Sequence, residues 1–220
     1  MKTNSELQKD VQDAIKWEPL LHSAEIGVIV KDGVVTLTGT VDNYAKKMEA
    51  ENATKKVNGV KAVVENIDVV FPNSIKKTDA AIATSVLSAL KADWSVPDDK
   101  ITVKVEDGWV TLEGKLAWNY QKEAARNAIK YLAGVKGVVN SIKIHADLHD
   151  KIEEKAIKKA LKRSVIDESD IEVAVSGTTV TLKGVVNTFF AKDEAERIAW
   201  KTPGIWHVKN ELAVEYEYAL

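Results

Sequence analysis

The stretch VTLTG at Val35–Gly39 recurs as VTLEG at Val110–Gly114 and as VTLKG at Val180–Gly184. The copies are 75 and 70 residues apart (35 to 110, then 110 to 180). The same two offsets align aliphatic residues upstream of each copy: Ile26, Val28 and Val30 with Ile101, Val103 and Val105, and with Ile171, Val173 and Val175. One frame that holds over so many positions predicts three tandem copies of a single module.

The modules are expected to span 1–72, 76–145 and 148–216. Within each of them the first helix falls in the same frame, because Leu7, Ile82 and Ile152 occupy one aligned position. The difference between the two offsets therefore lies in the linkers.

The pattern within each copy is that of a small α/β unit. Apolar residues spaced by four over Leu7–Ile15 predict an amphipathic helix, and the alternation over Ile26–Val30 predicts a half-buried strand. Asp32-Gly33 predicts a two-residue hairpin turn into a second strand at Val34–Val41. The third copy has Ser176-Gly177 instead, with the glycine shifted by one position.

A second helix and a third strand complete the unit. The helix is predicted at about 43–57, 118–132 and 188–202, and Gly59, Gly134 and Gly204 are placed as its C-terminal caps. The order α-β-β-α-β predicts an α+β fold, with a three-stranded mixed sheet and two helices on one face. The glycine at the end of Val35–Gly39 predicts a bend or a close backbone approach. The other face carries threonine and charged residues, with Trp109 as the exception.

This combined pattern resembles the BON domain of bacterial osmotic-stress and nodulation proteins: an aliphatic strand, Asp-Gly, Val-x-Leu-x-Gly, an alanine-containing helix and Gly-Val before the last strand. The resemblance covers nearly the whole chain in three copies. It implies a non-catalytic module that binds phospholipid or associates with the bacterial envelope. One branch of the family, fused to a LysM domain, binds potassium, and this chain contains no LysM segment.

Composition limits the classes of partner. The chain of 220 residues has 31 Lys+Arg, 33 Asp+Glu and no cysteine, so neither a global attraction to nucleic acid nor a disulfide framework is expected. No stretch approaches the roughly 18 apolar residues of a membrane span, and the N-terminus lacks the apolar run of a secretory signal. A soluble cytoplasmic protein is expected, or a periplasmic one if an export segment precedes this sequence in a longer chain.

Catalysis and metal binding are not predicted. The four histidines His22, His145, His149 and His207 occupy unrelated positions of the repeat, and no nucleophile elbow or phosphate loop is present. His145 and His149 are interpreted as linker residues. The acids at Asp98–Asp99 and Asp167–Asp170 are interpreted as solvated loop residues without the pattern of a calcium site. We expect no enzyme activity, no metal and no cofactor.

The third module begins with a lysine-rich helix. At 100° per residue, Lys151, Lys155, Lys158 and Lys162 form one basic stripe, with Lys159 beside it. Such a stripe favours contact with anionic lipid, at about 1 kcal/mol for each basic residue near the surface. The alternative is an ordinary solvated helix face.

Two further surfaces are candidates for contacts. Trp17 and Trp94 end the first helices of modules one and two, where an indole either meets a membrane or packs under the following loop. The helix that begins near residue 79 has no charge over 80–90, which predicts that a neighbouring module or another subunit covers it. The predicted interface residues on this helix are Thr84, Ser85 and Ser88. Trp109, the exceptional residue of the sheet, is predicted as a further interface residue.

The sequence therefore predicts a non-enzymatic binding or scaffold protein of BON type. Its partner is expected to be an anionic phospholipid or envelope surface in a stress response. Two alternatives stay open: sensing of potassium or another small ion, and contacts purely with protein, including a second copy of the chain.

Overall fold

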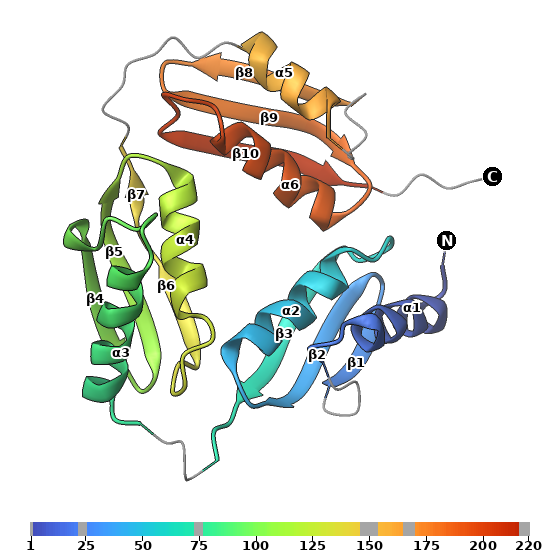
Figure 1. Cartoon of the computed structure of the whole chain (residues 1–220). Helices are drawn as coiled ribbons and strands as arrows, with labels where there is room; N and C mark the ends of the chain where they lie inside the picture. Colours follow the sequence, from blue (N-terminus) through green and yellow to red (C-terminus); the bar gives the residue numbers. More distant parts are fainter. Residues whose placement is uncertain (1, 22–25, 73–76, 146–153, 165–169, 216–220) are drawn as a thin grey trace. The chain divides into compact units, whose positions relative to one another are not determined.

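The computed structural model describes residues 2–21, 26–72, 77–145, 154–164 and 170–215. These residues form three separate small sheets, each with its own pair of helices (Figure 1). The predicted α+β fold of three repeated modules is confirmed. Each module is described below by itself.

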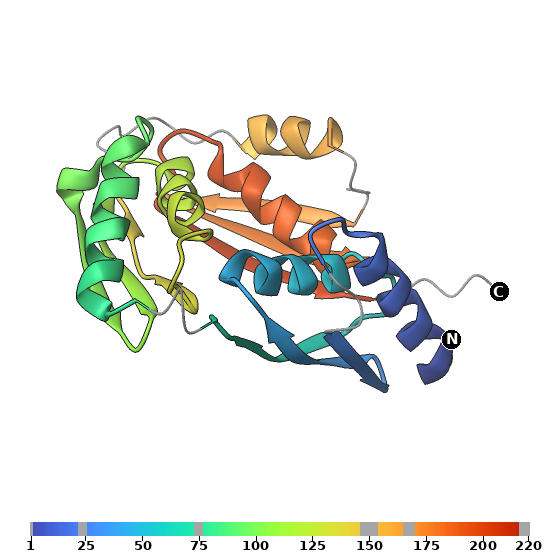
Figure 2. The same ribbon diagram turned by 60° about the horizontal axis from the view of Figure 1, so that its bottom comes forward.

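The first module has the order helix, two strands, helix, strand: α1(Asn4–Trp17), β1(Ile26–Lys31), β2(Val34–Val41), α2(Tyr44–Lys55) and β3(Ala62–Val69). Its strands are ordered β1-β2-β3, so β2 is central, and β1 pairs antiparallel with β2. Figure 2 shows α1 and α2 over the same side of this sheet.

The second and third modules repeat this arrangement. The second consists of α3(Asp79–Ala92), a 3-10 turn at Asp98–Lys100, β4(Ile101–Glu106), β5(Trp109–Leu116), α4(Asn119–Ile129), β6(Gly137–Asn140) and β7(Lys143–Ile144). The third consists of α5(Glu154–Lys162), β8(Ile171–Ser176), β9(Thr179–Val186), α6(Phe189–Trp200) and β10(His207–Val214). In both modules the hairpin strands are antiparallel, and the strand after the second helix pairs parallel to the central strand.

The core of each module lies between its helices and one face of its sheet. Val35 and Leu37 of β2 are completely buried, and so are the aligned Val110, Leu112, Val180 and Leu182. Residues that alternate with them point to the opposite, solvent-facing side. The repeated Val-x-Leu-x-Gly is thus the inner face of the central strand.

The hairpin turns keep one position in all three modules. Asp32 and Gly33 have φ of 51° and 84°, the two positive values that a tight two-residue turn requires. In the third module Gly177 has φ of 57°, and the turn still lies between Ser176 and Thr179. The shifted glycine therefore changes the turn chemistry without changing the strand register.

The sequence predicted that the glycines after the second helix are its C-terminal caps, and this prediction is wrong. The helix α2 ends at Lys55, and Gly59, with φ of 112°, lies in the turn beyond it. A Cβ atom on Gly59 would lie 3.0 Å from Leu7 of the first helix. This position is glycine because the turn packs closely on α1. The local sequence pattern does not show this tertiary contact.

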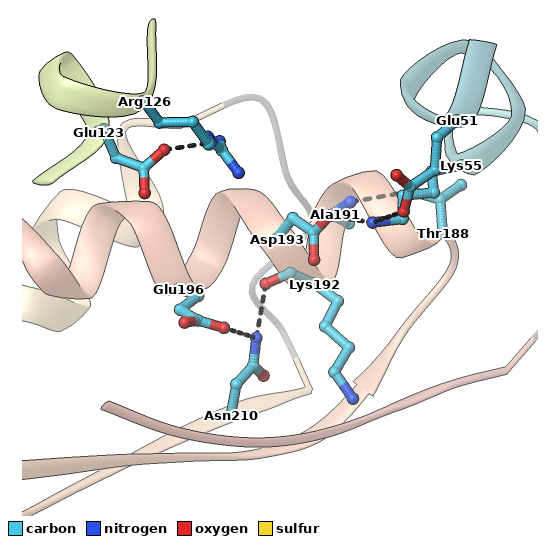
Figure 3. A network of polar contacts seen from close by, with 10 residues as sticks. All are labelled: Glu51, Lys55, Glu123, Arg126, Thr188, Ala191, Lys192, Asp193, Glu196 and Asn210. Atoms are coloured by element: carbon cyan, nitrogen blue, oxygen red, sulfur yellow. Dashed lines mark hydrogen bonds and ion pairs between the residues drawn. The ribbon is translucent and has the colours of Figure 1, made fainter. Parts of the chain in front are cut away.

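An inward-facing asparagine ties the last strand to the second helix. Asn210 Nδ2 donates to the carbonyl oxygen of Lys192 at 2.9 Å and to Glu196 Oε2 at 3.1 Å (Figure 3). The aligned Asn140 Nδ2 donates to the carbonyl oxygen of Lys122 at 2.8 Å. A half-buried amide that is hydrogen-bonded in this way fixes the helix on the sheet.

Candidate functional site

The first helices of modules one and two end in the same kind of turn, and the third module has Lys162–Ser164 at the aligned position. In α1, the N–H of Glu18 donates to Ile15 O at 3.2 Å, and the N–H of Leu21 donates to Glu18 O at 3.0 Å. In α3 the aligned bonds are Asp93 to Leu90 at 3.3 Å and Val96 to Asp93 at 3.0 Å. We name this turn the helix corner and define it as Trp17–Leu20, Ala92–Ser95 and Lys162–Ser164.

Two of the helix corners present a tryptophan to solvent. Trp17 is 89% exposed and Trp94 is 94% exposed. The apolar position under the turn is filled by Leu21 in the first module and by Val96 in the second, both buried. The interpretation of these tryptophans as residues packed under the following loop is therefore wrong. Hydration of two such large apolar rings costs free energy that burial against a partner would recover.

A local hydrogen-bond pair holds Trp94 in this position. Asp93 Oδ1 accepts the backbone N–H of Ser95 at 2.9 Å and its hydroxyl at 2.7 Å, on either side of Trp94. These two hydrogen bonds hold the pKa of Asp93 below its ordinary value, and the bond from the Ser95 hydroxyl has the larger effect. The indole is thus carried by an ordered turn, which lowers the conformational cost of placing it on a partner surface.

The third module has cations in place of the tryptophans. Lys155, Lys158, Lys159 and Lys162 of α5 are exposed, whereas Ile157 and Leu161 are buried. Lys158 forms an exposed ion pair with Glu154 at 2.6 Å, and such pairs are weak, about 0–1 kcal/mol. The remaining lysine of the predicted stripe, Lys151, lies outside the described residues.

Sequence reasoning missed two members of this site. Arg163 is exposed beside Lys162 at the third helix corner, and Leu20 is 46% exposed beside Trp17 at the first. The signal was available, because position 17 aligns with 162 in the repeat frame. In that frame Trp17, Ala92 and Lys162 share one position, and Trp94 follows two residues later in the same turn, so a tryptophan lies at or near this point in two modules and a cation in the third.

The residues predicted as an interface do not form one surface. Thr84, Ser85 and Ser88 lie on α3, and their hydroxyls donate to backbone carbonyls four residues earlier at 2.9–3.0 Å. Trp109 lies on the solvent-facing side of β5, where its ring covers Gly137 of the neighbouring β6. The helices cover the other face of this sheet, so Trp109 is separated from the three hydroxyl residues. A contact through Thr84, Ser85 and Ser88 stays a prediction.

The described residues contain neither a metal-binding cluster nor a membrane-spanning helix. Within the described ranges, no group of three or more His, Cys, Asp and Glu side chains is arranged to hold a metal ion. His22, His149 and 167–169 lie outside those ranges. Among the helices that the structure describes, none has the length and apolar composition of a membrane span.

The chain is similar in sequence to two known proteins and aligns weakly with a solved structure. The chain is 31% identical over 144 residues to osmotically-inducible protein Y of Escherichia coli. This alignment covers 64% of this chain and 72% of that protein. It is 27% identical over 124 residues to an uncharacterised protein of Anaplasma centrale, which covers 55% of this chain and 82% of that protein. The C-terminal domain of CdsD, a structural protein of the type III secretion system of Chlamydia trachomatis, aligns over 97% of this chain and 100% of its own, at 18% identity and a TM-score of 0.26.

The family model of the BON domain matches three consecutive segments, at residues 3–70, 78–146 and 149–216. Each of these segments contains one of the three sheets with its helices. The matches leave only short linkers uncovered, and they coincide with the three-fold repetition of Val-x-Leu-x-Gly. The chain belongs to the BON domain family, in three tandem copies.

Proposed function

We propose that this protein is a non-enzymatic peripheral binding protein whose helix corners contact anionic phospholipid surfaces. The observation that carries this proposal is the exposure of Trp17, the last residue of α1, and of Trp94, two residues beyond the end of α3. Tryptophan is enriched at membrane interfaces because its large apolar ring leaves water while its N–H stays near the polar headgroups.

The lysines of α5 supply the preference for negative charge. Each basic residue near an anionic surface contributes about 1 kcal/mol, so four of them give roughly millimolar affinity by themselves. Insertion of an indole adds apolar burial to this attraction. The two kinds of helix corner are therefore complementary: the cations select the surface, and the tryptophans strengthen the attachment.

The relation to osmotically-inducible protein Y supports a role under osmotic stress. We expect the transcript of this protein to rise when the osmolarity of the medium is raised. Binding at a phospholipid surface suits that condition, because a change of osmotic pressure acts on the membrane.

The test is flotation of the full chain with vesicles of phosphatidylglycerol and, in parallel, of phosphatidylcholine. Wild-type protein is expected to float with the anionic vesicles and to lose most of this binding at high salt. Lys155→Glu combined with Lys158→Glu should weaken binding by at least about tenfold. Trp17→Ala combined with Trp94→Ala should weaken it further and abolish the blue shift of tryptophan fluorescence.

The matched control is Lys115→Glu with Lys143→Glu. This pair makes the same change of charge at exposed positions on the solvent-facing side of β5 and β7, outside the residues that define the helix corners. Its binding should stay near that of the wild type. Absence of flotation by the wild type, or equal losses in the control and in the α5 variant, would contradict the proposal.

A further inference from the structure

The strand β1 is the edge of the first sheet, and its backbone has a defined outward side. The two-residue turn after Lys31 makes Lys31 and Val34 a hydrogen-bonded pair. Hydrogen-bonded pairs alternate along an antiparallel ladder, so Ile29 and Gly27 also bond to β2. The N–H and C=O groups of Ile26, Val28 and Val30 consequently point away from β2, toward the open edge.

This edge lacks the charges by which sheet proteins usually prevent edge-to-edge pairing. The aligned edge strand of the second module carries Lys104 and Glu106, and that of the third carries Glu172. In β1 the one charged residue is Lys31 at the end of the strand, where the second module has Glu106; residues 26–30 contain no charge, and Ile29 is 61% exposed at the position aligned with Lys104. Two modules of one chain are thus protected in the ordinary way, and the first is not.

The uncharged surface continues from the edge across the sheet. Ile29 pairs with Thr36 of β2, and Val64 of the neighbouring β3 is also exposed. In the second module the aligned residues are Lys104, Thr111 and Val139, so this row is interrupted by a charge at the edge. The first module therefore has an apolar row that ends at an unprotected strand.

We infer that β1 pairs antiparallel with β1 of a second copy of this chain, with Val28 opposite Val28. This register uses every outward N–H and C=O of Ile26, Val28 and Val30. It places Gly27, which has no side chain, opposite the exposed Ile29 of the other copy. The two Lys31 residues lie beyond opposite ends of the paired segment, so they do not repel each other.

The self-complementarity of the strand distinguishes a second copy from an unrelated extended peptide. Apolar residues meet apolar residues or Gly27 throughout the register, and the paired segment 26–30 presents no charge by which it selects a different sequence. The resulting sheet joins the two first modules and is independent of the helix corners, so the pairing holds whether or not the protein binds phospholipid.

Sedimentation and light scattering of the full chain over a range of concentrations test the pairing. The mass should rise from monomer toward dimer, and amide exchange at Val28 and Val30 should slow in parallel. Ile29→Lys, which copies the residue of the second module, and Ile29→Glu should each raise the dissociation constant by at least about tenfold. Ile29→Thr, which is neutral and β-branched, should pair like the wild type.

A mixture of the Ile29→Lys and Ile29→Glu chains should recover the dimer, because the opposite charges meet on the same face. This recovery also shows that both variants are folded. A monomer at every concentration, or a dimer in which exchange at Val28 and Val30 does not change, would overturn the inference. So would a dimer that both charged variants form as strongly as the wild type.

Discussion

At the scale of single residues, the repeated glycine of Val-x-Leu-x-Gly is set by a close approach of two backbones. Gly114 and Gly184 have φ of 150° and 117°. A Cβ atom on either would collide with the carbonyl oxygen of the residue that precedes the first strand, Lys100 or Asp170. Gly177, in the hairpin turn of the same module as Gly184, also has a positive φ but has open space around it.

Comparison of Gly184 and Gly177 in the third module distinguishes the cost of backbone strain from the cost of steric overlap. Gly184→Ala should lower the free energy of unfolding of the module by about 3 kcal/mol, because conformational strain and overlap add. Gly177→Ala should lower it by only about 1 kcal/mol, the strain alone. Urea unfolding followed by hydrogen exchange of β8–β10 measures both changes, and equal losses in the two variants would refute the assignment.

At the scale of elements, the first helices of modules one and two begin in nearly the same way. Thr3 caps α1 by accepting the N–H of Glu6, and Thr78 caps α3 by accepting the N–H of Ala81. Of these two caps, only that of α1 is a capping box with a reciprocal hydrogen bond, in which Glu6 Oε2 accepts the N–H of Thr3 at 2.7 Å. The backbone bond and then the hydroxyl bond from Thr3 lower the pKa of Glu6 below its ordinary value of 4.5.

The two caps should therefore respond differently to acid. Thr3→Ala and Thr78→Ala should each cost about 1 kcal/mol at neutral pH. The pKa of Glu6 is lower in the folded state than in the unfolded state. Its contribution to the stability of α1 is therefore complete above pH 4.5 and disappears as the pH falls through the lower folded-state pKa. The cost of Thr3→Ala should thus shrink in acid and that of Thr78→Ala should not, as measured by exchange of the α1 and α3 amides.

At the scale of the whole molecule, each sheet is complete within its own module. No strand is shared between the three sheets of the described residues, and each has a central strand with its own buried Val and Leu. The modules are alike in this inner framework and differ at the surface: two helix corners have tryptophan, one has cations, and one edge strand has no charge before its last residue.

Independent cores predict independent unfolding. We expect calorimetry of the full chain to show more than one transition, and Gly184→Ala to lower the temperature of one of them while leaving the others in place. The reference is Gly114→Ala, which should move a different transition by the same mechanism. A single transition that both variants shift equally would contradict separate modules.

Much of the candidate site was predicted from the sequence. Trp17, Trp94 and the lysines of α5 were identified from their positions at helix ends and from helical periodicity. Whether the two tryptophans are exposed was not determined by that pattern, because it depends on which residue fills the space under the turn. Leu21 and Val96 fill it, and this competition between neighbouring apolar residues is resolved only when the turn is formed.

The sequence by itself determined the module, its three-fold repetition and the order of its elements, because each of these depends on local periodicity and on glycines at fixed spacing. Only the tertiary structure decided the strand order, the packing of Gly59 on Leu7 and the collision that excludes a side chain at Gly184. It also decided that β1, whose residues 26–30 carry no charge, lies at an edge of its sheet. These features depend on contacts between residues far apart in the chain, and a periodic pattern carries no information about such distances.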